Sequence, residues 1–150
     1  MKNLLFTLLI MVTLVGCGAS ATQDKATVQE TVLTIINGDN QQIYTINDLK
    51  TLPSMVSSFN DIDYMGVSVI FLLKEAGVNI NEISAVKAVA TDGYSINYEP
   101  AQLLPDDVLV AYSLADGGSM ASDEGKFRMV LPDQEGNQNL RLLYKLVIIP

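Results

Sequence analysis

Histidine is absent from the 150-residue sequence, and cysteine occurs once, at Cys17. Without histidine, the chain cannot form a Ser-His-Asp triad, a histidine metal site or a histidine general base. A single cysteine excludes an intrachain disulfide and any metal site built from several cysteines. These two absences exclude much of ordinary enzyme chemistry.

Basic residues are also scarce. The chain has 9 lysines and arginines against 17 acidic residues, a formal net charge of −8, and an isoelectric point of about 4.3. The basic residues form no run, so nucleic acid and anionic membrane surfaces are poor partners, because binding to them depends on clustered cations. The length suits one domain of ordinary size with a core that needs no disulfide.

The first segment has the pattern of an export signal. A short basic start, Met1-Lys2-Asn3, precedes an almost wholly apolar stretch at residues 4–14, which is short for a membrane span. The stretch ends in Leu14-Val15-Gly16-Cys17, which resembles the lipobox of bacterial lipoproteins, where the peptide is cut before a cysteine that is then lipidated. We expect residues 1–16 to be a signal peptide and Cys17 to be lipidated. The alternative is a plain secretory signal with an incidental cysteine.

Residues 17–30 are small and polar without an apolar period, which predicts a flexible tether. Gly18 follows the cysteine, so the acidic residue that marks inner-membrane retention in enteric lipoproteins is absent. By that resemblance we expect an extracytoplasmic protein, lipid-anchored to the cell envelope, on the outer membrane if the cell is Gram-negative.

Residues 31–150 show the pattern of a folded domain. Runs of β-branched and apolar residues, separated by turn clusters, predict strands at residues 32–36, 55–59, 85–90, 94–98, 108–114, 127–131 and 140–149.

Short helices are expected between these strands. Thr45 and Asp48 have capping spacing for the first helix, Ser68 precedes an amphipathic second helix that ends at Gly77, and Pro100 begins a third. Six or seven strands with two or three short helices predict an α+β domain with a mixed or antiparallel sheet.

Several motifs occur in the order and spacing of one known family. They are Asp48-Leu49-Lys50-Thr51-Leu52-Pro53, Tyr64-Met65-Gly66-Val67, the segment at residues 72–78, Ala90-Thr91-Asp92-Gly93-Tyr94-Ser95 and Arg128-Met129-Val130-Leu131-Pro132. Together they resemble the sulfite-oxidase-like molybdopterin-binding domain over residues 32–149. The resemblance implies the fold of that family for residues 31–150.

The sequence departs from this family at the metal site. Enzymes of the family bind molybdenum through a cysteine that lies between the "LP" and "YxGV" segments, and the corresponding residues here, 55–63, contain no cysteine. The family's histidine before the arginine motif is replaced by the region Ser122-Asp123-Glu124. A molybdopterin phosphate needs basic partners, yet the only arginines are Arg128 and Arg141. These departures argue against a molybdenum cofactor and an active molybdenum oxidoreductase.

Small family members without the cysteine are similar to extracytoplasmic proteins that bind a free pterin and report it to a membrane partner. A carboxylate such as Asp92 can accept from the guanidine-like edge of a pterin, and Arg128 can donate to its carbonyl. Tyr64 or Tyr94 can stack on its flat ring. The resemblance therefore implies a ligand site at Tyr64, Asp92, Tyr94 and Arg128, with no catalytic or metal-binding residue.

Each of these residues also has a purely structural interpretation. Asp92 suits a tight turn with Gly93, and Tyr94 alternates with Tyr98 along a predicted strand. Tyr64 can pack against the helix that follows it, and Arg128 can pair with a neighbouring acid.

Asp61 and Asp63, in the loop where the family has its cysteine, can line a pocket, bind a hard cation or simply be solvated.

Two classes of function therefore compete. The first is a tethered protein that binds a pterin-like small molecule and acts with a membrane receptor or sensor. The second is an interaction or structural lipoprotein whose pocket is degenerate, and a molybdopterin-dependent oxidoreductase comes third. A concave pocket lined by Tyr64, Asp92, Tyr94 and Arg128 favours the first class.

Overall fold

The computed structural model describes residues 31–150. The expected signal peptide (residues 1–16), the lipidation site Cys17 and the tether (residues 17–30) lie outside the described residues. Within residues 31–150, no helix is both long and apolar enough to cross a membrane.

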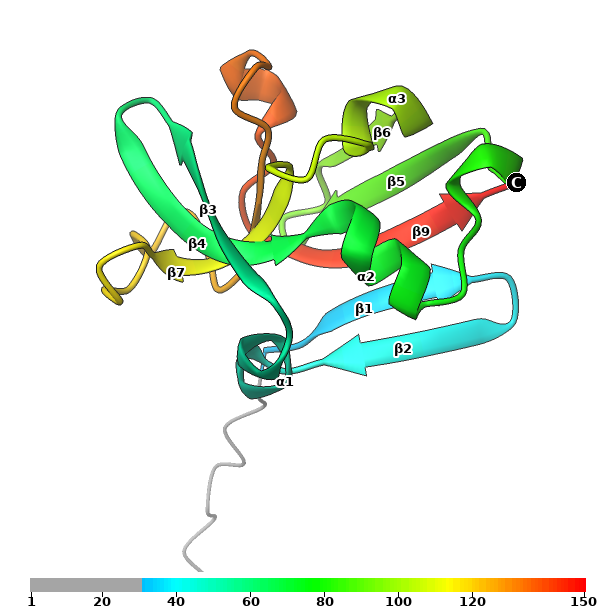
Figure 1. Cartoon of the computed structure of the whole chain (residues 1–150), viewed down its shortest axis with the longest axis horizontal. Helices are drawn as coiled ribbons and strands as arrows, with labels where there is room; N and C mark the ends of the chain where they lie inside the picture. The colour runs from blue at the N-terminus through cyan, green and yellow to red at the C-terminus, as the bar shows by residue number, and fades with distance from the viewer. Residues whose placement is uncertain (1–30) are drawn as a thin grey trace, which may run out of the picture.

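Five strands form a mixed sheet: β1 (Leu33–Asn37), β2 (Asn40–Tyr44), β5 (Ala85–Ala90), β6 (Ser95–Tyr98) and β9 (Leu143–Ile149). Their order is β2-β1-β9-β5-β6, with β1 parallel to β9 and every other neighbouring pair antiparallel. The hairpin of β5 and β6 closes through the predicted turn at Asp92, at one edge of this sheet (Figure 1).

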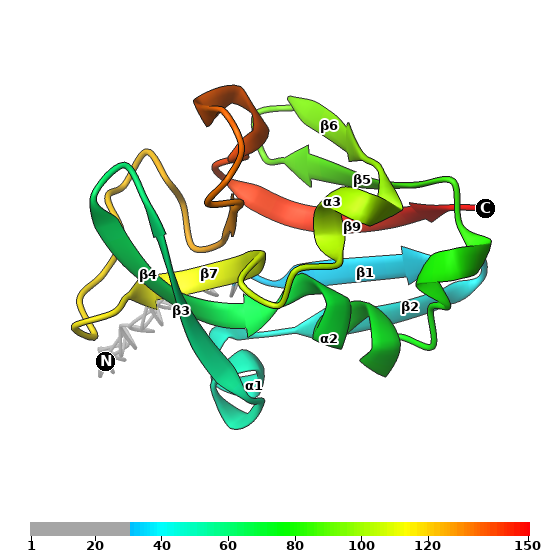
Figure 2. The same ribbon diagram turned by 45° about the horizontal axis from the view of Figure 1, so that its top comes forward.

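Four strands form a second, wholly antiparallel sheet: β3 (Ser54–Phe59), β4 (Ile62–Ser68), β7 (Leu109–Leu114) and β8 (Arg128–Val130), in the order β3-β4-β7-β8. The hairpin of β3 and β4 turns through Asn60 and Asp61, whose φ angles of 53° and 61° suit a two-residue hairpin turn. Figures 1 and 2 show this hairpin reaching away from the body of the domain.

Three short α-helices connect the strands: α1 (Ile46–Thr51), α2 (Val69–Glu75) and α3 (Pro100–Leu103), with 3-10 turns η1 (Ile80–Glu82) and η2 (Gly136–Gln138). Thr45 and Asp48 form the predicted capping box. Ser68 stands at the predicted N-cap of α2, but its hydroxyl caps nothing, because it is buried without a hydrogen-bond partner. Gly77 ends that helix at a φ of 70°, as predicted.

The α+β prediction is confirmed, but residues 31–150 contain nine strands rather than six or seven. The prediction missed β2, which is polar and follows a strong turn cluster. It also missed β4, because Asp61, Asp63 and Gly66 interrupt the apolar pattern there. Asp63 lies in β4, opposite Ser58 of β3, and not in a loop.

The two faces of the four-stranded sheet pack differently. One face joins α2 and the five-stranded sheet in the main core, through residues such as Val110, Tyr112 and Met129. The other face carries a smaller cluster of Tyr64, Leu109, Ala111 and Val130. Because side chains alternate along β8, Arg128 shares this second face with Val130.

Candidate functional site

Tyr64, Glu124 and Arg128 form a buried hydrogen-bonded network on the second face. The Tyr64 hydroxyl donates to Glu124 Oε1 at 2.7 Å, and Arg128 Nη1 donates to the Tyr64 hydroxyl at 2.8 Å. Arg128 also forms an ion pair with Glu124. The second Glu124 oxygen accepts from the Ala121 N–H at 3.1 Å. Each member therefore holds the other two in place.

Two aromatic rings flank the guanidinium group. Its central carbon lies 4.6 Å from the centroid of the Tyr64 ring and 5.6 Å from that of Phe59, within the range of cation–π attraction. Arg128 Nε donates to the Met129 carbonyl at 3.4 Å. Nη2 makes no hydrogen bond within residues 31–150, so its N–H groups are able to donate to another molecule.

The network holds its members in defined protonation states. Burial alone raises the pKa of Glu124, but the hydrogen bonds from Tyr64 and Ala121 and the charge of Arg128 outweigh it, so its pKa lies below the ordinary value. Burial, and then the hydrogen bond to Glu124, raise the pKa of Tyr64 to about 12. At neutral pH the site thus contains a carboxylate, a guanidinium ion and a neutral phenol.

A hollow of about 400 Å³ opens beside this network. We call it the first hollow; its wall includes Tyr64, Glu124 and Arg128, the hairpin residues Phe59, Asn60 and Ile62, and Gly136 and Asn139 from the η2 segment. The hairpin of β3 and β4 and the segment around η2, drawn in orange, stand side by side in Figures 1 and 2. The volume is within the range of small-molecule sites.

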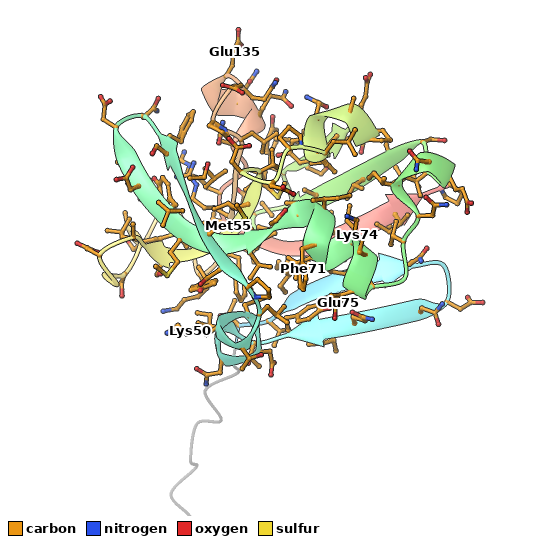
Figure 3. The ribbon with its side chains drawn as sticks, viewed as in Figure 1. Lys50, Met55, Phe71, Lys74, Glu75 and Glu135 are labelled. Carbon is orange, nitrogen blue, oxygen red and sulfur yellow. The ribbon has the colours of Figure 1, made fainter. Side chains whose placement is uncertain are left out.

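Asn139 fixes the η2 side of this hollow. Its side-chain oxygen accepts from the Leu131 N–H at 2.7 Å, and its amide nitrogen donates to three carbonyls, of Leu131, Gln134 and Glu135. The Tyr98 hydroxyl donates to the Gln138 carbonyl at 2.5 Å. Glu135 points outward from this segment, away from the sheets (Figure 3). Sequence reasoning did not single out Asn139, because an asparagine in a loop gives no local sign of burial.

Asp92 and Tyr94 line a second hollow of about 520 Å³. Asp92 accepts from the Tyr94 backbone N–H at 3.0 Å, as in a tight turn, and the Tyr94 side chain is largely exposed. The second hollow shares Asp123 and Arg141 with the first. These two side chains form an exposed ion pair at 2.6 Å.

The structure thus divides the four predicted ligand residues into two pairs. Tyr64 and Arg128 are in direct contact, whereas Asp92 and Tyr94 belong to the neighbouring hollow. Tyr64 lies within β4, the strand that precedes α2, and its ring packs in the smaller cluster with Leu109, Ala111 and Val130. Arg128 does form an ion pair with a neighbouring acid, Glu124, but this pair is buried.

Sequence reasoning missed Glu124 as a site residue. The only indication in the sequence was its position four residues before Arg128. At this spacing an acid and an arginine can form an ion pair when the chain between them turns. Asp61, by contrast, lies exposed in the hairpin turn and lines neither hollow, and Asp63 accepts a hydrogen bond from Ser58.

The donor set at the first hollow does not fit molybdenum. Where the resemblance places the metal-binding cysteine, the structure has the hairpin of β3 and β4, and its residues Phe59, Asn60 and Ile62 on the wall offer no thiolate. The groups that are present suit a polar, planar organic ligand: a guanidinium donor, carboxylate acceptors and aromatic rings.

Comparison with known proteins gives a family and a fold. The family model described as "Oxidoreductase molybdopterin binding domain" matches residues 21–150. Among solved structures, the chain is similar to the sulfane dehydrogenase SoxCD from Paracoccus pantotrophus, with a TM-score of 0.69 and 21% sequence identity over 81% of this chain. The match covers 38% of the SoxCD chain, and at this identity it shows the fold alone. No curated protein matches the chain.

Proposed function

Because the chain belongs to the oxidoreductase molybdopterin-binding domain family, we propose that it binds a pterin-type heterocycle in the first hollow without carrying out a redox reaction. The observation that carries this proposal is the fixed guanidinium of Arg128 on the wall of that hollow. Its Nη1 and Nε are engaged by the protein, while Nη2 has no partner within residues 31–150.

The chemistry of the hollow supports a flat ligand with mixed donors and acceptors. The free Nη2 of Arg128 can donate to a ring carbonyl of such a ligand. Phe59 on the hairpin offers an aromatic surface for stacking. Tyr64 and Glu124 would hold the guanidinium in position and make no direct contact with the ring.

A binding role is favoured over catalysis because the chain lacks the family's thiolate ligand in residues 55–63. Family membership alone leaves a molybdopterin-dependent oxidoreductase as the alternative. We further propose that the protein is anchored to the cell envelope through a lipid on Cys17 and passes the binding signal to a membrane partner. The lipobox-like sequence and the polar residues that follow it support this part of the proposal.

Thermal unfolding of the purified chain with a panel of oxidised and reduced pterins tests the binding proposal. A ligand at 100 times its dissociation constant should stabilise the fold by about 2.7 kcal/mol, which raises the midpoint by several degrees. Arg128→Lys keeps the positive charge beside Glu124 but removes the second donor nitrogen. We expect this variant to bind at least about tenfold more weakly.

Arg141→Lys is the matched control, because it makes the same exchange at an exposed arginine on the rim of the same hollow. It should keep pterin binding. If no pterin shifts the midpoint of the unchanged protein, the binding proposal is wrong, and an interaction lipoprotein with a degenerate pocket becomes the better account.

A further inference from the structure

The two hollows adjoin, and we call them together the groove. Both are lined by Asp123, Gly136, Asn139 and Arg141, so the ion pair of Asp123 and Arg141 stands where they meet. A ligand whose ring occupies the first hollow can therefore extend a substituent past this pair toward Asp92 and Tyr94.

The groove contains more negative than positive charge. Three carboxylates line it, those of Asp92, Asp123 and Glu124, against the two guanidinium groups of Arg128 and Arg141. Both guanidinium groups are already paired, Arg128 with Glu124 and Arg141 with Asp123. No lysine of residues 31–150 lines either hollow, and Asp92 has no ion pair within that range.

A phosphate group would meet poor surroundings here. It needs cations or N–H donors that are free to pair with it, and it is repelled by nearby carboxylates. In this groove it would compete with Asp123 for Arg141 and approach the unpaired Asp92. A neutral or cationic substituent is not repelled by these carboxylates.

Building on the proposed function, we infer that Asp123 sets the charge selectivity of the groove, so that the protein accepts unphosphorylated pterins and rejects their phosphate esters. Asp123 is suited to this role because it neutralises Arg141, the one guanidinium of the groove with an exposed side chain. Glu124 is buried and fixes Arg128. Removal of the Asp123 charge leaves Arg141 free to pair with a phosphate.

The test is a titration of the full chain with 6-hydroxymethylpterin and, separately, with its monophosphate ester. Binding is detected through the change in fluorescence of the pterin ring. The two probes share the ring and differ in the phosphate. The unchanged protein should bind the alcohol at least about tenfold more tightly than the ester. In Asp123→Asn that preference should fall by about tenfold, through a gain in affinity for the ester.

Asp106→Asn is the matched control, since Asp106 is exposed and lines neither hollow. It should keep the original preference. Equal binding of both probes by the unchanged protein, or an unaltered preference in Asp123→Asn, would overturn the inference while leaving pterin binding in place. Failure of every pterin to bind would instead overturn the proposed function and this inference with it.

Discussion

Glu124→Gln is expected to lower the free energy of unfolding by roughly 3–5 kcal/mol, because it leaves the Arg128 guanidinium buried without a counter-charge. The side chains of Arg128 and Glu124 are only 4% and 12% exposed. Glutamine has nearly the same shape, and its oxygen can still accept from Tyr64 or from the Ala121 N–H. The substitution therefore removes mainly the charge, and urea unfolding measures its effect.

Two further variants make this result specific. Asp123→Asn removes one partner of the exposed pair with Arg141, whose side chains are 57% and 66% exposed, and should cost no more than about 1 kcal/mol. Adding Arg128→Met to Glu124→Gln removes the buried, unpaired guanidinium, so the double variant should recover much of the lost stability. An equal cost for the buried and the exposed variants would contradict our account of the network.

The same ion pair predicts a loss of stability in acid. The pKa of Glu124 lies below its usual value of 4.5 in the folded protein, so the unfolded chain binds the proton first as the pH falls. The stabilisation is complete above about pH 4.5 and is lost as the pH drops toward the lower folded pKa. Urea unfolding from pH 6 to pH 3 should show this loss in the unchanged protein. The double variant Glu124→Gln with Arg128→Met should lose less stability over that range.

The elements predicted correctly are those with local signals. The capping box of Thr45 and Asp48, the left-handed Gly77 and the turn at Asp92 each depend on a few neighbouring residues. Strand β2 was missed because its sequence is polar, and it is held as an edge strand by pairing with β1. That pairing is a tertiary interaction, which local pattern does not reveal.

The candidate site was predictable only in part for the same reason. Tyr64 and Arg128 are 64 residues apart and meet because β7 pairs with both β4 and β8. The family motifs identified the two residues, but neither motif shows that they touch. The position of Asp92 in a neighbouring hollow depends on how the two sheets pack, which the sequence pattern does not specify.

Gly66→Ala is expected to destabilise the domain by about 3 kcal/mol or more, enough to reduce its soluble yield. A Cβ atom at this position would lie 2.2 Å from the Val110 carbonyl oxygen and 2.7 Å from the Ala111 Cα. Both atoms belong to the backbone of β7, so no side chain can rotate away. The register of β4 against β7 shifts between Met65 and Gly66, where the strands approach each other.

Gly136→Ala and Gly77→Ala are the controls for urea unfolding of this variant. A Cβ at Gly136 meets only the Phe59 ring, at 3.8 Å, so the stability of Gly136→Ala should change little even though residue 136 lines the first hollow. The methyl group of Gly77→Ala has open space, but residue 77 has a φ of 70°, which is unfavourable for alanine. This variant should therefore lose about 1 kcal/mol of unfolding free energy. Stability close to that of the unchanged protein in Gly66→Ala would contradict the close approach of β4 and β7. If the close approach holds, any folded fraction of Gly66→Ala should also bind pterin weakly, because the shift that admits the methyl group moves Tyr64 relative to Arg128.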